Sequence, residues 1–413
     1  MLVAEVAVVG GGPAGAAAAV TLARAGRHVV LVDKARFPRD KCCGDGLTAG
    51  ALRELEALGL RPETVPGWQD VHEVYLRSPS GRVVHLPLPR GPGEGLFAAC
   101  APRVTLDAAV LDLARGAGAK VLDGHSLRRA SLTAGGDGIE LDVDGLGPVS
   151  AQYAIGADGA WSPLRKALGV HQQGYLGDWH AFRQYFTGCG PATSDLWVWF
   201  EPDLLPGYMW SFPLSDGRAN VGFGLERNES FDAHRMGQLW PELLARPHVR
   251  AVLGEGATPE GPHRAWPIPA RVREVPLTAA GGRALFVGDA ACATDPLTGE
   301  GIAQALLTGR RAAEAILASR GSDEPAAVAR RYERAVGRDL FADHWLGDVL
   351  SRGLSHPKGA RVAIRAAGAS DWTRRNFARW LFEDYPRAVV GTPRRWRPRM
   401  FTAPGAYRQQ VRP

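Results

Sequence analysis

Three glycines near the start of the chain have the spacing of a loop that binds a diphosphate. In VAVVGGGPAG, Gly10 permits a tight turn, Gly12 lets the backbone approach a diphosphate, and Gly15 lets the next helix lie against the strand. Pro13 suits the first helical turn, where its missing N–H costs nothing. The carboxylate of Asp33 is placed to accept from ribose hydroxyls. The residues expected to contact a dinucleotide here are Gly10, Gly12, Pro13, Ala14, Gly15, Asp33 and Lys34.

The segments around these glycines supply a strand, a helix and a second strand in the required order. Val6–Val9 is an apolar run too short for a helix, and an alanine-rich helix follows it as far as Gly26. The second strand, His28–Val32, ends at Asp33. We therefore predict a βαβ dinucleotide-binding unit rather than a glycine-rich turn without a ligand. This pattern alone does not separate FAD from NAD.

A second group of segments lies near residue 290 and carries a family resemblance. Ala284–Val287 is predicted to be a buried strand, and the loop Pro296–Gly301 opens a helix over Ile302–Leu317. This arrangement resembles the second FAD-binding motif of the flavoprotein family that includes p-hydroxybenzoate hydroxylase, flavin-dependent halogenases and geranylgeranyl reductases. The resemblance implies that Asp289 hydrogen-bonds the ribityl chain. It also places the helix N-terminus at the flavin's pyrimidine edge, where it favours negative charge.

Two further positions match the same family. Asp158-Gly159, followed by Ser162 and Arg165, resembles the family's DG motif, which lies near the cofactor. Arg103 stands where the family has an arginine beside the flavin, and pairing with a nearby acid is the alternative role for it. The cofactor-binding residues implied by the resemblance are Arg103, Asp158, Gly288, Asp289, Pro296, Gly299, Glu300, Gly301 and Ile302.

Two more motifs are similar to those of geranylgeranyl reductases. KCCGD at residues 41–45 resembles their K-x-C-G-[DE] element beside the flavin ring, which implies cofactor contacts for Lys41, Cys43 and Gly44. Cys42 departs from the pattern, since proline is common at that position. YMWSFP at residues 208–213, with Asn220 downstream, matches their YxWxFP element. Halogenases carry WxWxIP and need a catalytic lysine, and no lysine here is an obvious candidate.

The resemblance implies an FAD-dependent reductase in which hydride from reduced FAD saturates a carbon–carbon double bond of an isoprenoid or other apolar substrate. NAD(P)H or a reduced redox protein would supply electrons, without a separate NADPH domain because no second GxGxxG motif is present. Cys43 is expected nearest the flavin ring with Asp45 as its partner, and a cysteine that only packs is the alternative. The catalytic candidates are Cys43, Asp45, Tyr208 and Trp210.

Other functions stay open at this stage. An FAD-dependent monooxygenase that hydroxylates or epoxidises an aromatic or terpenoid substrate has the same FAD motifs, and a halogenase is a further alternative. A flavoprotein fold that binds lipid or a partner without turnover is the non-catalytic alternative.

Segments with alternating polarity lie between the FAD motifs and predict the strands of a substrate-binding sheet. They include VHEVYLRSPSGRVVHL and the tryptophan-rich DLWVWFEPDLLPGYMWSFPL. An aromatic wall suits a long apolar ligand, and an ordinary sheet core is the alternative. The expected substrate contacts are Trp197, Trp199, Tyr208, Trp210, Phe212 and Trp266.

The length of 413 residues predicts two joined domains rather than one. We expect an α/β protein with a Rossmann-type FAD-binding domain assembled from separate segments, a β-sheet substrate lobe and a helical C-terminal region with a basic tail. The predicted FAD-binding segments are 1–70, 100–170 and 276–320. The lobe comprises 71–99 and 171–275, and the C-terminal region 321–413.

The charge distribution is uneven, because residues 365–413 contain eleven arginines against three acidic residues. This tail, with interleaved Phe and Trp residues, suggests peripheral contact with an anionic membrane, and packing on its own domain is the alternative. No nucleic-acid-binding motif accompanies the charge. Five cysteines without disulfide or zinc spacing, and the lack of a signal peptide, predict a cytoplasmic protein without a metal site. The sequence does not indicate an oligomeric state.

Overall fold

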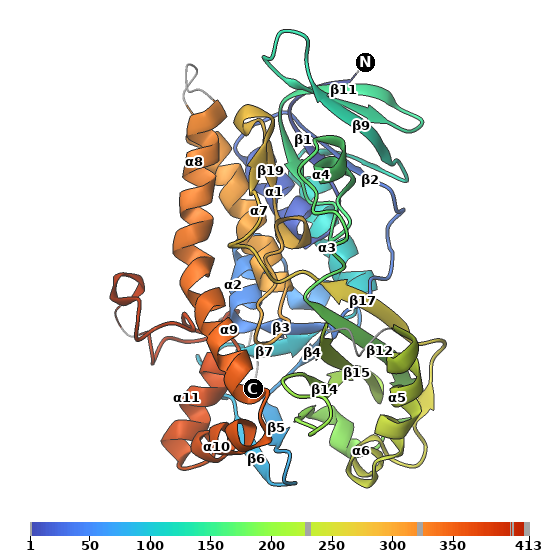
Figure 1. Ribbon diagram of the computed structural model, residues 1–413, viewed down its shortest axis with the longest axis vertical. Helices are drawn as coiled ribbons and strands as arrows, with labels where there is room; N and C mark the ends of the chain where they lie inside the picture. The colour runs from blue at the N-terminus through green and yellow to red at the C-terminus, as the bar shows by residue number, and fades with distance from the viewer. Residues whose placement is uncertain (1, 228–232, 320–324, 397, 399, 409–413) are drawn as a thin grey trace.

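A largely parallel sheet occupies the upper part of the molecule and contains the predicted βαβ unit (Figure 1). The computed structural model describes residues 2–227, 233–319, 325–396, 398 and 400–408. Strands β19, β11, β1, β2 and β8 run parallel in that order, and the antiparallel strands β10 and β9 extend from β11. The strands are β1 Leu2–Val9, β2 Val29–Asp33, β8 Lys120–Asp123, β9 Leu127–Leu132, β10 Ile139–Val143, β11 Gly147–Gly156, β18 Thr278–Ala279 and β19 Ala284–Phe286.

Helices α1 (Pro13–Arg24), α3 (Arg103–Gly116) and α7 (Ile302–Leu317) pack together beside this sheet. The predicted helix over 302–317 is confirmed. Gly26, in the left-handed region at φ 79°, follows the end of α1, as its sequence position predicts. Strand β1 begins at Leu2 rather than Val6, because its first residues pair with β11. The Rossmann-type fold, assembled from segments far apart in the chain, is therefore confirmed.

A second sheet forms the lower right of Figure 1. Its strands follow the order β16-β12-β15-β14-β13-β5-β6, with β17 beside β12. Helices α5 (Ala233–Ala245) and α6 (Pro247–Leu253) pack on one face through a cluster of buried apolar side chains. The strands are β5 Glu73–Arg77, β6 Val83–Pro87, β12 Trp179–Thr187, β13 Leu196–Trp199, β14 Tyr208–Leu214, β15 Arg218–Glu226, β16 Thr258–Pro259 and β17 Arg264–Ile268.

A small sheet and several helices complete the molecule. Strand β7 pairs with both β3 and β4 in this third sheet. Helix α8 continues through a π-helical turn, Gly337–Phe341, into α9, which confirms the helical C-terminal region. None of the helices among the described residues combines the length and the apolar character needed to cross a membrane. The remaining elements are β3 Gly46–Thr48, β4 Gln69–Asp70, β7 Ala98–Cys100, α2 Ala49–Ala57, α4 Pro163–Ala167, α8 Pro325–Val336, α9 Ala342–Leu354, α10 Pro357–Ala367 and α11 Asp371–Leu381.

Helices α1 and α7, which belong to the two FAD motifs, touch backbone to backbone, with no side chain between them. A Cβ atom at Gly309 would lie 2.0 Å from the carbonyl oxygen of Ala14. A Cβ atom at Gly288 would lie 3.1 Å from the Cβ of Ala14. Because a backbone oxygen cannot move aside as a side chain can, the glycine at position 309 is required for this helix pair.

We therefore expect Gly309→Ala to push α1 away from α7 and to lower the free energy of unfolding by about 1–3 kcal/mol. Gly237→Ala is the matched control, since it also lies in a helix but a Cβ atom there meets no described atom within 4 Å. The control should be neutral or stabilising by up to about 1 kcal/mol, because alanine is the better helix former. Thermal unfolding of both variants is the measurement, and equal melting temperatures would contradict the assigned contact.

Candidate active site

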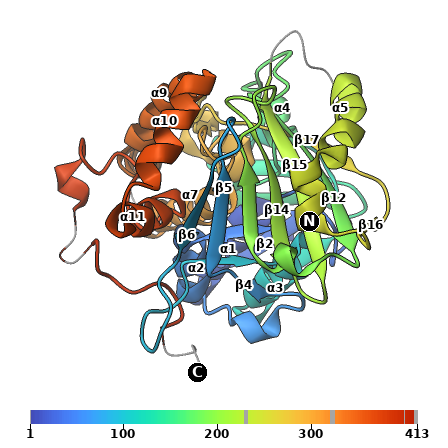
Figure 2. The same cartoon turned by 90° about the horizontal axis from the view of Figure 1, so that it is seen from below.

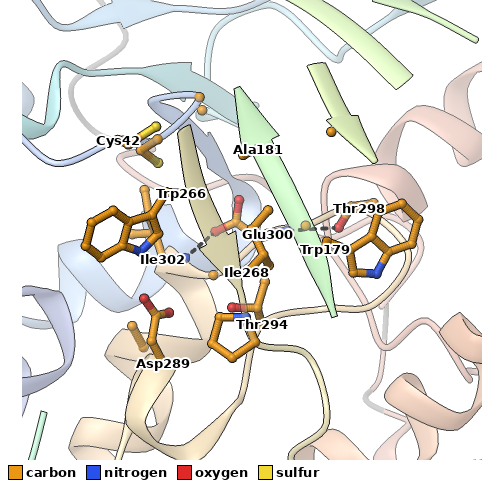
Figure 3. Close-up of a pocket in the computed structure, with 18 of the residues that line it drawn as sticks. Cys42, Trp179, Ala181, Trp266, Ile268, Asp289, Thr294, Thr298, Glu300 and Ile302 are labelled. Carbon is orange, nitrogen blue, oxygen red and sulfur yellow. Dashed lines mark hydrogen bonds between the residues drawn. The ribbon is translucent and has the colours of Figure 1, made fainter. Parts of the chain in front are cut away.

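A cavity of about 1320 Å³ runs between the two large sheets and the C-terminal helices. One part is bounded by the glycine loop after β1, and the other by apolar side chains of β13, β14, α10 and α11. Figure 3 shows Glu300 between Trp266 and Trp179, with Cys42 and Asp289 close to the same space. The cavity therefore brings together residues from every motif that the sequence singled out.

The glycine loop at one end has the shape of a diphosphate cradle. Cβ atoms at Gly10 and Gly15 would lie 2.2 Å from the oxygen of Ala157 and 1.8 Å from the oxygen of Gly10, so packing requires both glycines. A Cβ atom at Gly12 would approach only the Arg39 guanidinium, at 3.6 Å. The protein's own packing thus does not require glycine at position 12, which lines the cavity at the start of α1. A helix N-terminus with open space beside it fits the diphosphate of FAD.

Asp33 lines the cavity at the end of β2 and is also tied to the glycine loop. Its Oδ2 accepts from the backbone N–H of Gly11 at 2.6 Å, and its Oδ1 accepts from Ala35 at 2.7 Å. Lys34 and Ala14 line the same end of the cavity. These bonds fix the carboxylate beside the loop, where the sequence places a ribose ligand.

Arg103 lines the cavity and pairs with an acid, so the structure shows the ion pair considered for it, and its contact with the flavin stays a prediction. Its Nε and Nη2 donate to the two carboxylate oxygens of Asp107 at 2.6 and 2.8 Å. Arg39 adds a second ion pair to Asp107, at 2.7 Å. Burial opposes ionisation of Asp107, but the guanidiniums outweigh it and hold its pKa below the usual range. The acid therefore holds two cations at the cavity wall.

Lys41 and Asp289, which are 248 residues apart in the chain, form an ion pair of 2.8 Å beside the cavity. Burial would raise the pKa of Asp289, but Lys41 outweighs it and the pKa is lowered. Asp289 is thus a carboxylate that can accept hydrogen bonds. Gly288, Gly299, Gly301 and Ile302 line the same part of the cavity, whereas Pro296 does not and instead packs near Gly347 of α9.

Asp158 lines the cavity and also organises the start of α4. Its carboxylate accepts from Ser162 Oγ at 2.5 Å and from the backbone N–H of Leu164 at 2.8 Å. Burial raises the pKa of Asp158 to about 6. The neighbouring Arg165 donates to the carbonyl of Ala290 at 3.0 Å, so the DG motif is connected directly to the loop after Asp289.

The KCCGD turn is held by a polar network beneath it. Asp45 has a left-handed backbone, φ 66°, and its carboxylate accepts from Tyr185 Oη at 2.6 Å and from Asn220 Nδ2 at 2.9 Å. Asn220 Nδ2 also donates to the carbonyl of Cys43 at 2.7 Å. Burial raises the pKa of Asp45 to about 6. Sequence reasoning missed Tyr185 and gave Asn220 no role.

Cys43 carries a neutral thiol in this setting. Burial raises the pKa of its thiol, and this effect exceeds the stabilisation of the thiolate by Arg103. The structure assigns the Asp45 carboxylate to Tyr185 and Asn220, so its contact with Cys43 runs through the backbone of the turn. The charge of Asp45 also raises the pKa of the Cys43 thiol, and the predicted partnership between the two side chains stays a prediction.

The aromatic residues of β14 lie directly over this turn. The ring of Phe212 lies 3.1 and 3.0 Å from the positions of Cβ atoms built on Gly44 and Gly46. Trp210 Nε1 donates to Asn220 Oδ1 at 3.2 Å, and Tyr208 Oη donates to the carbonyl of Thr298. Tyr208, Trp210 and Phe212 all line the cavity, so strand β14 connects its apolar part to both the turn and the loop before α7.

Trp197 and Trp199 do not line the cavity. They share one face of β13, as predicted, but Trp199 is fully buried in the core beneath α5 and α6, and Trp197 stacks on Tyr75. Leu196 and Val198 face the cavity instead. We therefore remove the two tryptophans from the substrate contacts. Trp266 lines the cavity, and its Nε1 is a buried donor without a hydrogen-bond partner among the described residues.

A cluster of acids lies at the start of α7. Glu300 Oε1 accepts from the backbone N–H groups of Ile302 and Ala303 at 2.8 and 3.0 Å (Figure 3). Glu383 and Asp295 both pair with Arg387, at 3.3 and 3.0 Å. Burial, with repulsion from Glu383, raises the pKa of Glu300 to about 8. At neutral pH Glu300 is therefore a protonated acid in the cavity wall.

This protonation makes folding stability depend on pH. The folded-state pKa of Glu300, about 8, lies above the ordinary value of 4.5. The stabilisation of the folded state by protonated Glu300 is therefore complete below pH 4.5. It is lost as the pH rises from 4.5 through 8, and in this window the free energy of unfolding falls by up to about 1.4 kcal/mol per pH unit. We expect Glu300→Gln, which keeps the acceptor oxygen, to reduce the fall in melting temperature between pH 6 and 8. Glu63→Gln, at an exposed position, is the control and should keep the wild-type slope. Equal slopes for both variants would contradict the assignment.

Comparison with known proteins agrees with this geometry. The FAD binding domain family matches residues 3–318. The chain is 36% identical to menaquinone reductase of Mycolicibacterium smegmatis over 329 residues, which cover 73% of this chain and 74% of that protein. It is 33% identical to digeranylgeranylglycerophospholipid reductase 1 of Methanopyrus kandleri over 316 residues, 73% of this chain and 77% of that protein.

A solved structure shares the whole architecture. A geranylgeranyl bacteriochlorophyll reductase-like protein from Thermoplasma acidophilum aligns with a TM-score of 0.80 over 96% of this chain and 100% of its own, at 21% identity. This similarity shows a common fold that includes the C-terminal helices. The family match and the sequence relatives lead to one assignment: the chain belongs to the FAD binding domain family and is an FAD-dependent oxidoreductase resembling the geranylgeranyl reductases.

Proposed function

We propose that this protein is an FAD-dependent reductase that saturates a carbon–carbon double bond in an isoprenoid chain bound in the cavity. The observation that carries the proposal is the continuity of one cavity from the diphosphate cradle to a wall of apolar side chains. A long apolar ligand requires such a wall, and a flavin requires the cradle. The sequence relatives are named as reductases of a quinone and of a geranylgeranyl lipid, which supports the substrate class.

The proposed division of the chain follows the sheets. Residues 1–70, 100–170 and 276–320 supply the parallel sheet and its helices, and we assign them to the FAD-binding domain. Residues 71–99 and 171–275 supply the second sheet, which we assign to the substrate lobe. Residues 321–413 form the helical C-terminal region, of which 321–324, 397, 399 and 409–413 lie outside the described residues.

Several residues would hold FAD and orient it. The glycine loop would bind the diphosphate, Asp33 the ribose and Asp289 the ribityl chain, while Lys41 and Arg103 supply positive charge. The dinucleotide-binding set is Gly10, Gly12, Pro13, Ala14, Gly15, Asp33, Lys34, Lys41, Cys43, Gly44, Arg103, Asp158, Gly288, Asp289, Gly299, Glu300, Gly301 and Ile302. When bound and reduced, FAD supplies the hydride for one carbon of the double bond.

The protein's own contribution is positioning, exclusion of water and a proton for the second carbon. An isolated double bond polarises poorly, so a dry cavity that fixes the chain must supply much of the catalysis. The neutral thiol of Cys43 holds a proton at Sγ. Trp210 and Tyr208 hold the isoprenoid chain of the substrate against the KCCGD turn, which Asp45 anchors. Phe212 and Trp266 complete the substrate contacts in this proposal.

The electron donor and the location are parts of the same proposal. NAD(P)H or a reduced redox protein would reduce FAD from outside, because the chain has no second GxGxxG motif. All five cysteines are free thiols, which supports a reducing, cytoplasmic compartment. Peripheral contact with a membrane would give access to a lipid substrate.

The decisive experiment separates a reductase from a monooxygenase. Enzyme reduced with dithionite and kept free of oxygen should convert a geranylgeranyl lipid into a product two mass units heavier. Mass spectrometry of the lipid fraction is the measurement, and enzyme without dithionite is the control. A product sixteen units heavier that forms only with oxygen would replace the reductase by the monooxygenase.

The cradle predicts a separate effect on cofactor binding. Gly12→Val should fold normally, because among the described residues only the flexible side chain of Arg39 lies within 4 Å of its Cβ, but valine would occupy the diphosphate space. The purified variant should contain little FAD, measured as the ratio of flavin to protein absorbance, with a melting temperature close to that of wild-type protein stripped of FAD. Full FAD occupancy would rule out this placement of the diphosphate.

A further inference from the structure

The cavity has an opening at the junction of α9 and α10, far along the chain from the FAD motifs. Gly353, at the end of α9, and Lys358 and Val362 of α10 line the cavity and are also exposed to solvent. Figure 2 shows α9 and α10 side by side at the outer edge of the molecule. A lining residue that also meets solvent marks a mouth, so a ligand can reach the apolar part of the cavity here.

Exposed apolar side chains lie on the two helices that carry this mouth. Trp345 and Val349 of α9 are 56% and 41% exposed, and Val362 of α10 is 64% exposed. Trp345, Val349 and Arg352 follow helical spacing, so they lie on one side of α9. An exposed apolar patch of this kind on a soluble chain marks a surface that binds something.

Basic side chains accompany the apolar patch. Arg361 and Arg365 are exposed on α10, on the same side as Lys358 and Val362, and Arg352 is exposed on α9. Arg361 and Arg365 form no ion pair with any residue that the structure describes. The acids of α9, Asp343 and Asp348, are instead paired with Arg395 and Arg273. We call the surface formed by Trp345, Val349, Arg352, Arg361, Val362 and Arg365 the α9–α10 face.

This face shares only Arg365 with the basic tail, residues 365–413, that suggested a membrane contact. Phe377 and Trp380 line the cavity and Phe382 is buried, so these aromatic residues do not face outward. Arg379 and Arg387 are buried in ion pairs with Asp384 and Asp295. Trp372 and Trp396 of the tail are exposed, but neither lines the cavity, whereas α9 and α10 carry exposed apolar and basic side chains beside its mouth.

We infer that the α9–α10 face docks on an anionic lipid bilayer and delivers a membrane lipid directly into the mouth of the cavity. Apolar side chains would enter the interface while the arginines bind anionic headgroups, the pattern of a peripheral membrane helix. Charge complementarity favours an anionic bilayer over an apolar protein partner. The mouth lies beside this face, so a lipid of the docked bilayer could enter the cavity directly. The inference rests on the proposed function for the identity of the lipid, but not for the docking itself.

The test is cosedimentation of the FAD-loaded, full-length protein with vesicles of phosphatidylcholine and phosphatidylglycerol in a three-to-one ratio, compared with phosphatidylcholine alone. Each surface arginine contributes about a fivefold change in partitioning, so Arg361→Glu/Arg365→Glu should weaken binding at least about 25-fold. Arg128→Glu/Arg129→Glu, which reverses two exposed arginines on β9 at the opposite end of the molecule, is the matched control and should bind like wild type.

A second variant, Trp345→Ser, leaves the charge unchanged and should also weaken vesicle binding. The inference fails if wild-type protein binds both vesicle types equally weakly, or if the variants bind as well as the control. It also fails if the face forms a dimer that Trp345→Ser dissociates, because a second copy would then be its occupant.

Activity measurements keep the two proposals apart. With lipid embedded in the same vesicles, Arg361→Glu/Arg365→Glu should lose turnover, and with detergent-dispersed lipid it should turn over like wild type. Vesicle binding without reduction of any double bond would overturn the proposed function and leave the docking intact. Reduction in detergent with no vesicle binding would do the reverse.

Discussion

Helices α1 and α7 approach each other so closely that only hydrogen atoms fit between parts of their backbones. Gly309 and Gly288 lie against Ala14, and the same helix α1 packs on the loop of β1 through Gly15. This contact sets the N-termini of both helices at one cavity, although their sequences lie almost 300 residues apart. Every later feature of the site depends on it, including the Lys41–Asp289 pair and the meeting of the glycine loop with the acids before α7.

The buried acids in the cavity wall differ in protonation state because their neighbours differ. Asp107 and Asp289 stay ionised because each has cations within hydrogen-bond distance. Glu300 has only backbone donors and a repelling acid nearby, so it stays protonated at neutral pH. The positive charge on the wall thus faces the predicted diphosphate and ribityl positions, whereas the apolar part of the cavity is lined mainly by neutral groups, with Lys358 at its mouth. That separation suits one ligand that is charged and another that is not.

Local sequence patterns predicted the parts of the fold that depend on local rules. The bounds of α7 and the stop of α1 at Gly26 follow from helix periodicity and glycine conformation, and the structure agrees with both. Alternation correctly placed Trp197 and Trp199 on one face of β13, but periodicity cannot tell which face meets α5 and α6. Tyr185, Asn220 and Arg387 were beyond prediction for another reason, because their roles arise from partners roughly 90 to 180 residues away. The composition of the tail is basic, but Asp384 within the tail pairs with the buried Arg379, and the distant Asp295 pairs with the buried Arg387.

The mouth at α9–α10 and the KCCGD turn lie at different depths of one cavity. If the headgroup of a lipid stays with the arginines at the surface, its chain can extend inward only by a fixed length. The number of carbons between the headgroup and Cys43 then determines which double bond reacts, and the protein does not need to recognise the bond itself. Regioselectivity would in that case be a property of cavity depth, and lining residues far from the reacting atoms would set it.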